Sequence, residues 1–289
     1  MMKTACRNLA ALALLALAAV ATSAATAQFR KIAPEAVRKQ VEVSMLLTGT
    51  IDIEPDGSVS GYVLDDRAKV PGYVASLLDR RVPAWRFEPV MRGGQAMAVR
   101  SPMSLRVVAK PLDGDNFALS ISGVSFGGDS TTTDYVTRDR MDPPSYPVAM
   151  SRIGASGTVY LLLQIGRDGR VSDLLVEQVN LAVLDTEDQM ARMRKQFGDA
   201  ATAAAWNWTY HPPTTGEEVD DPHWTVRVPV SFELDGDKPA GYGQWQAYLP
   251  GPRARAAWAH DGASPDAIAG GGVYPVGGGV KLITPLQEG

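Results

Sequence analysis

Apolar and polar residues alternate most regularly between residues 224 and 234. The apolar members lie two apart along the chain, so one side of this strand is predicted to pack against a core. They are Trp224, Val226, Val228, Val230, Phe232 and Leu234. Pro229 lies inside the run and has no N–H to donate, which indicates a strand at the edge of its sheet.

A second alternating run covers residues 158–165 and ends in Gly166-Arg167-Asp168-Gly169, a tight-turn sequence. Residues 171–176 are then predicted to return as the second strand of a hairpin. The segment from Asp199 to Trp208 is rich in alanine and has no helix breaker, which predicts a helix capped by Asp199. Residues 181–197 are interpreted as an insertion between this hairpin and the helix.

Three short segments of this region occur a second time, earlier in the chain and in the same order. One contains tryptophan, an aromatic residue and proline at alternate positions, one is an Asp-Gly turn, and one begins the last strand. The corresponding segments are 85–89 and 208–212, 56–59 and 168–171, and 100–105 and 227–232. Such self-similarity predicts two tandem copies of one small α+β domain, at residues 28–112 and 142–235.

The remaining parts of the chain differ in composition from these two copies. Residues 113–141 are polar and rich in Gly, Ser and Thr apart from a strand-like stretch at 117–124, so they are predicted to form a linker. Residues 236–289 are rich in Gly and Pro, which predicts a largely disordered tail. Its aromatic residues are expected to pack back on a domain, or alternatively to anchor a partner; they are Trp245, Tyr248, Trp258 and Tyr274.

Residues 1–27 have the pattern of a secretory signal. Lys3 and Arg7 precede an apolar run that begins at Leu9, and Ala25-Thr26-Ala27 provides small residues for cleavage. Export to the periplasm is therefore predicted. The alternative is an uncleaved inner-membrane anchor, and only in that case would the chain contact a membrane.

The net charge bears on nucleic acid as a partner, and the cysteine content bears on disulfide and thiol chemistry. The formal net charge is −4, which gives no reason to expect nucleic acid as a partner. The single cysteine, Cys6, lies within the predicted signal. A cleaved chain would therefore have neither a disulfide nor thiol chemistry.

The ordered set of motifs after residue 141 resembles the TonB C-terminal domain family. The match extends over about residues 142–235, and residues 34–110 resemble a degenerate member. The elements that carry it are Tyr146-Pro147, Gly154, Gly157, Asp168-Gly169, Trp208-x-Tyr210-x-Pro212, Gly216 and the strand V-x-V-P-V-x-F at 226–232.

The resemblance implies, for each copy, a three-stranded antiparallel sheet with two helices on one face. In this family the domain binds an extended segment of an outer-membrane transporter, the TonB box, by adding it as a strand to an exposed sheet edge. Carried over to this chain, the partner is a periplasmic segment of such a transporter or of another envelope protein. The binding residues would be Tyr146, Pro147, Thr225, Val226, Arg227, Val228, Pro229, Val230 and Ser231.

The main alternative within the family is a membrane-anchored energy transducer. It would need residues 1–27 to be retained, and the chain has no histidine before His211 for proton-channel partners. The two copies could also pair edge to edge, and the oligomeric state is left open.

Catalytic and metal-binding chemistry was weighed against these binding functions. Gly123-Val124-Ser125-Phe126-Gly127 matches the G-x-S-x-G of serine hydrolases, but the following residues are poor helix formers, unlike a nucleophile elbow. His211 and His223 could bind a metal only with carboxylates from residues 217–221. We therefore predict no enzyme activity, no metal and no cofactor.

Overall fold

The computed structural model describes residues 37, 39–112, 116–127, 133–216, 218–234, 240–259, 264–268, 270–277 and 280–286. The predicted signal segment, residues 1–27, lies outside these residues. None of the helices in these ranges is long and apolar enough to cross a membrane.

The first half of the chain forms an antiparallel sheet with the strand order β12-β1-β5-β6, in which β2 also pairs with β1. Its strands are β1 (Glu42–Ile53), β2 (Val59–Leu64), β5 (Val99–Pro111), β6 (Phe117–Phe126) and β12 (Gln246–Tyr248). Helix α3 (Gly72–Arg81) buries Val74 and Leu78 against this sheet. The short elements are η1 (Arg67–Lys69), η2 (Val82–Ala84) and the β3–β4 hairpin (Met91–Arg92 and Gln95–Ala96).

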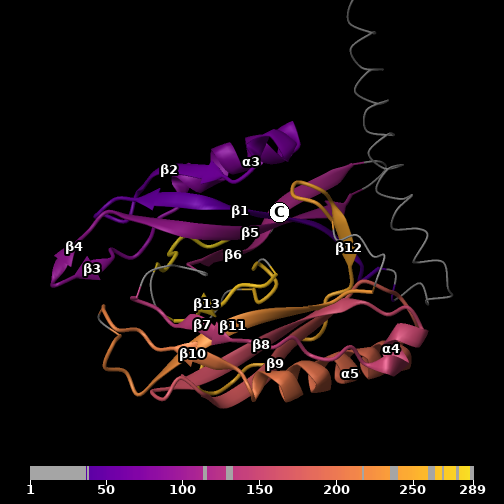
Figure 1. The fold of residues 1–289 in the computed structure, drawn as a ribbon. Helices are drawn as coiled ribbons and strands as arrows, with labels where there is room; N and C mark the ends of the chain where they lie inside the picture. The colour runs from indigo at the N-terminus through magenta and orange to yellow at the C-terminus, as the bar shows by residue number, and fades with distance from the viewer. Residues whose placement is uncertain are drawn as a thin grey trace, which may run out of the picture.

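The second half forms an antiparallel sheet with the order β13-β11-β8-β9. Its strands are β8 (Gly157–Gly166), β9 (Val171–Leu181), β11 (His223–Phe232) and β13 (Tyr274–Pro275). The helices α4 (Val148–Arg152) and α5 (Glu187–Ala205) lie on one side of this sheet (Figure 1). Beside it, β7 (Thr137–Arg140) pairs with β10 (Thr209–His211).

The two sheets turn their helix-free faces toward each other, and segments of the C-terminal region lie between them (Figure 1). Asp266 connects the two faces: its carbonyl oxygen accepts a hydrogen bond from Arg106 Nε of β5 at 2.6 Å, and its carboxylate accepts one from Asn180 Nδ2 of β9 at 3.2 Å. Each helix-covered face has its own apolar core. Helices therefore form the outer layers, and the polar contacts of Asp266 with Arg106 and Asn180 lie between the two sheets.

The repeated Trp-x-aromatic-x-Pro and Asp-Gly segments lie against each other in both halves. Gly57 has φ +79°, and its carbonyl oxygen accepts a 2.8 Å hydrogen bond from the Phe87 N–H; a Cβ on Gly57 would lie 2.0 Å from the Phe87 carbonyl oxygen. Gly169 has φ +74°, and its carbonyl oxygen accepts a 2.8 Å hydrogen bond from the Tyr210 N–H; a Cβ on Gly169 would lie 2.2 Å from the Tyr210 carbonyl oxygen. Only glycine fits both the left-handed backbone and this close approach. This contact is the physical reason why the two motifs recur together.

The α+β class is confirmed, but the sheets are larger than predicted. Five and four strands replace the expected three, because β12 and β13 of the predicted tail and β6 of the predicted linker join the two sheets. Of these added strands, β6 covers the strand-like stretch expected at 117–124. The interval 113–141, predicted as a linker, contributes β6 and β7. The tandem-domain arrangement stays a prediction, supported by the shared order of hairpin, helix and long strand.

The tail was predicted to be largely disordered, and for its described residues this is wrong. Leu249 and Ala267 are fully buried, and Tyr248 and Tyr274 are nearly so. The tail follows sheet edges, where it satisfies backbone groups: β12 pairs with β1, and Leu249 exchanges two hydrogen bonds with Leu181 at the end of β9. Three of the four aromatic residues pack back on the rest of the chain as expected, namely Trp245, Tyr248 and Tyr274. The indole of Trp245 donates to the hydroxyl of Tyr73 at 2.9 Å.

Helix α5 begins twelve residues before the predicted cap at Asp199. The true N-cap is Thr186, whose side chain accepts a hydrogen bond from the Gln189 N–H. The predicted insertion at 181–197 therefore contains the first half of the helix. It buries Met190, Met193 and Phe197, which explains why the family spacing is extended here.

Candidate functional site

The outer edge of β11 is the place where the structure holds most of the predicted partner-binding residues. Thr225 to Ser231 all lie on β11, as the sequence predicted. On its inner side β11 pairs with β8 along its whole length. On its outer side the chain's own β13 pairs with it, Val226 opposite Pro275 and Arg227 opposite Tyr274, and Val276 N–H donates to the Thr225 carbonyl at 2.9 Å.

The backbone direction along this edge follows from that hydrogen bond. In an antiparallel ladder the N–H and C=O of one residue point to the same neighbour, and successive residues alternate. Thr225 points outward, so Arg227, Pro229 and Ser231 share that direction. Because the N–H that Pro229 lacks would face outward, β11 tolerates proline without losing a bond to β8.

The tail stays beside β11 beyond the two paired residues of β13. Continued in the same antiparallel register, Gly270 lies opposite Ser231, and a Cβ at Gly270 would be 3.7 Å from the Ser231 hydroxyl oxygen. The predicted edge is therefore accompanied by the chain's own C-terminal region, and the described ladder covers only residues 226–227.

Tyr146 and Pro147 lie away from the Thr225 end of this edge. The Tyr146 ring packs edge-on against Phe197 at 5.9 Å and Phe232 at 5.8 Å, and its hydroxyl donates to the Ala155 carbonyl. Pro147 is the N-cap residue of α4. Both residues thus lie near the last residue of β11, where Tyr146 closes the core under α5.

Arg227 is part of a buried ionic cluster that the sequence pattern did not predict. Its Nε lies 2.6 Å from Glu177 Oε2 and its Nη2 lies 3.1 Å from Oε1, and Arg253 Nη2 approaches Oε1 at 2.8 Å. The side chains of Arg227 and Glu177 are each only 3% exposed. The arginine within this strand was a weak sequence signal of such a cluster. The other members, Glu177 of β9 and Arg253 of the tail, are distant in sequence and could not be inferred from it.

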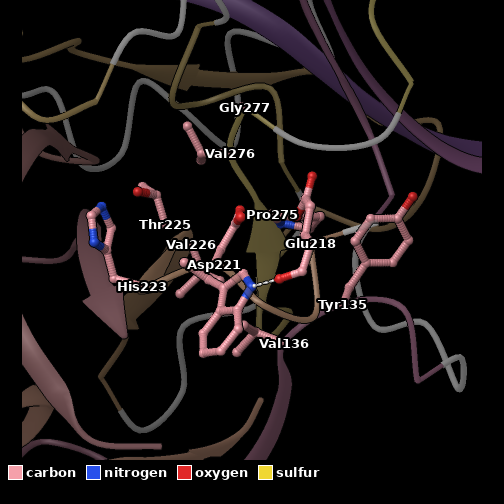
Figure 2. A pocket seen from close by; sticks show the side chains of 11 residues that line it. Tyr135, Val136, Glu218, Asp221, His223, Thr225, Val226, Pro275, Val276 and Gly277 are labelled. Carbon is pink, nitrogen blue, oxygen red and sulfur yellow. Dashed lines mark hydrogen bonds between the residues drawn. The ribbon is translucent and has the colours of Figure 1, made fainter. Parts of the chain in front are cut away.

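A small hollow lies at the beginning of β11, where β13 docks (Figure 2). Its volume of about 160 Å³ is below the roughly 300–1,000 Å³ of ligand pockets. The Trp224 indole donates to the Glu218 carbonyl at 2.9 Å, shown as a dashed line in Figure 2. Burial, and then the neighbouring charge of Asp221, raise the pKa of the Glu218 carboxyl. The hollow suits a side chain better than a substrate.

The sites weighed for catalysis and metal binding are not brought together. Ser125 lies inside β6, opposite Ser104 of β5, and not on a strand-to-helix turn. Nε2 of the exposed His211 lies 3.5 Å from an Asp139 oxygen, whereas His223 lines the hollow. Within the described residues no group of three or more potential metal ligands occurs; Glu217 lies outside them.

The fold and this edge define an α+β protein whose second sheet holds an added strand at its outer margin. No family model matches the chain. It is 29% identical over 101 residues to Protein TonB from two strains of Xanthomonas campestris pv. campestris, B100 and ATCC 33913. The match covers 35% of this chain and 39% of each relative, so the chain spans about two-fifths of their length.

A solved structure, the solution NMR structure of the Pseudomonas aeruginosa TonB C-terminal domain, also matches. The identity is 22%, and the match covers 38% of this chain and 94% of that one, with a TM-score of 0.27. The sequence relationship confirms the resemblance to the TonB C-terminal domain family, while the degenerate first copy stays a prediction.

Proposed function

We propose that this chain is a non-enzymatic protein of the bacterial envelope that binds an extended segment of a partner protein at the outer edge of β11. The partner is a periplasmic segment of an outer-membrane transporter or of another envelope protein. The TonB relationship supports this class of function. The observation that carries the proposal is that β11 already accepts an extended antiparallel segment at Thr225–Arg227, supplied by its own chain.

The corresponding strand of the first sheet favours β11 as the binding edge. On the outer side of β5 the strand β6 pairs over nine positions, from Met103 opposite Phe126 to Pro111 opposite Phe117. The β5 edge is thus filled by a long strand of the same chain. On β11 the same position has only the two residues of β13. Strand addition is therefore assigned to the second half, and a structural role to the first.

The proposal is tested with a fluorescently labelled TonB-box peptide and the full chain, by anisotropy. Thr225→Pro removes an outward N–H from the edge, whereas Thr225→Ala keeps it and serves as the control. We expect the alanine variant to bind like the wild type and the proline variant to bind at least about tenfold more weakly. Val228 is unsuitable for this test, because its backbone points toward β8 and proline there would damage the sheet.

Equal binding by the Thr225→Pro and Thr225→Ala variants would contradict the proposal. Absence of binding at high micromolar peptide by every variant, including the Val276→Pro variant described below, would contradict it as well.

A further inference from the structure

The tail residues on the β11 edge bury side chains on both faces of the sheet. Val273, 3% exposed, packs into the core beneath α5, and Tyr274, 8% exposed, packs with Tyr160 and Ile268 on the opposite, inner face. Successive side chains of a strand point to opposite faces, so this alternation is what an added strand requires. The segment Val273-Tyr274-Pro275-Val276 therefore matches the edge in side chains as well as in backbone.

The proline of this segment lies where a missing N–H has no cost. Thr225 and Val276 are joined by a backbone hydrogen bond, so the next pair, Val226 and Pro275, belongs to the non-hydrogen-bonded kind. The nitrogen of Pro275 then faces away from β11. A partner segment in the same register can have proline at this position without losing a bond.

The backbone ladder that joins this segment to β11 is short, because only two residues of β13 pair with the strand. Gly270, Gly271 and Gly272 precede it and Gly277 follows it, and glycine loses more conformational freedom on ordering than any other residue. Pro229 limits the ladder on one side, because it offers no outward N–H to a continuing strand. An incoming segment therefore has to replace only a short ladder.

We propose that Val273-Tyr274-Pro275-Val276 is an internal stand-in for the partner strand. The partner segment accordingly runs antiparallel to β11 and contains an apolar residue, an aromatic residue, proline and a β-branched residue in succession. Its aromatic ring occupies the place of Tyr274 in the cluster with Tyr160 and Ile268, and its binding displaces β13. This inference rests on the proposed function and adds to it the chemistry of the partner and the competition by the tail.

The experiment compares two variants of the full chain. Val276→Pro removes the N–H that donates to Thr225 and so weakens the pairing of the tail with the edge; Val276→Ala keeps that N–H and is the matched control. The probes are a labelled peptide with the sequence of residues 270–280, and the same peptide with alanine in place of the tyrosine and the proline. Dissociation constants are measured by anisotropy for each variant and each peptide.

We expect Val276→Pro to bind the first peptide at least about tenfold more tightly than Val276→Ala binds it. We also expect Val276→Pro to bind the alanine-substituted peptide at least about tenfold more weakly than it binds the first peptide. Equal affinity of Val276→Pro for the two peptides would refute the sequence pattern while leaving strand addition intact. Equal affinity of the two variants for the first peptide would refute competition by the tail. If Val276→Pro bound neither these peptides nor a TonB-box peptide, the proposed function itself would fail.

Discussion

Glu177→Gln removes the negative charge at the centre of the buried cluster behind the β11 edge. Glu177 lies on β9 and is 2% exposed. It receives a two-pronged hydrogen bond from Arg227 and a further pair from Arg253 on one of its oxygens. The glutamine side chain has the same shape but only one acceptor oxygen and no charge.

The magnitude of the effect depends on how far each arginine can return to water. The Arg227 side chain is 3% exposed and stays buried without a counter-charge, whereas Arg253 is 24% exposed and can turn outward. Removing one partner of a buried ion pair costs about 3–5 kcal/mol. Because natural domains are stable by only about 5–15 kcal/mol, this change should remove a large share of the free energy of unfolding.

The assay is urea unfolding of the full chain, followed by tryptophan fluorescence. Arg253→Gln is the control, since it leaves the Arg227–Glu177 pair intact and is expected to cost only about 1 kcal/mol. The denaturation midpoint of Glu177→Gln should therefore fall well below that of the control. If the two midpoints were equal, the two-pronged pair would not contribute as the geometry indicates, and the argument from burial would be wrong.

Three further predictions concern the turn, the core and the hollow. Gly169→Ala should destabilise the chain much more than Gly154→Ala in thermal unfolding: both positions have positive φ, but a Cβ at Gly169 meets a carbonyl oxygen at 2.2 Å and one at Gly154 meets nothing within 4 Å. Phe197→Ala should lower the free energy of unfolding by about 3–5 kcal/mol in the same measurement. The Phe197 ring is fully buried and is stacked on the Phe232 ring, with 4.7 Å between the ring centroids. The third prediction concerns Glu218, whose pKa is raised in the folded state by burial and then by Asp221. Its contribution to stability is present below the unfolded pKa of about 4.3 and is lost as the pH rises through the higher folded pKa. Glu218→Gln should therefore reduce the fall in stability over that pH range, and an unchanged pH profile would contradict the assignment.

Local sequence patterns determined the strands and turns of this protein. The apolar parity of β11 is confirmed at five positions, from Trp224 to Phe232, all of which are buried. The Asp-Gly turns were also predicted from the sequence. In the structure, Asp56 and Asp168 each accept a hydrogen bond from the backbone N–H two residues later, as is typical of such turns. These features depend on side-chain alternation and on φ preferences within a few residues, so a sequence alone contains them.

Two features were mispredicted, one through competing local signals and one through contacts between distant segments. The start of α5 at Glu187 was missed because an alanine-rich run gave a stronger local signal than the cap at Thr186. Predicting that the tail would be disordered rested on its Gly and Pro content, which takes no account of sheet edges with unpaired backbone groups.

The edge of β11 shows most clearly which features the sequence predicts and which depend on the tertiary structure. Pro229 indicated an edge strand, and the strand does end its sheet apart from β13. What lies against that edge could not be predicted, because Tyr274 comes 47 residues after Arg227, with which it pairs in the ladder. The Tyr274 side chain lies with Ile268 and with Tyr160, which is distant in sequence, on the inner face. The sequence by itself determined which strand offers an edge, and the tertiary structure decided that the chain's own tail occupies it, because pairing energies between remote segments depend on their approach in space.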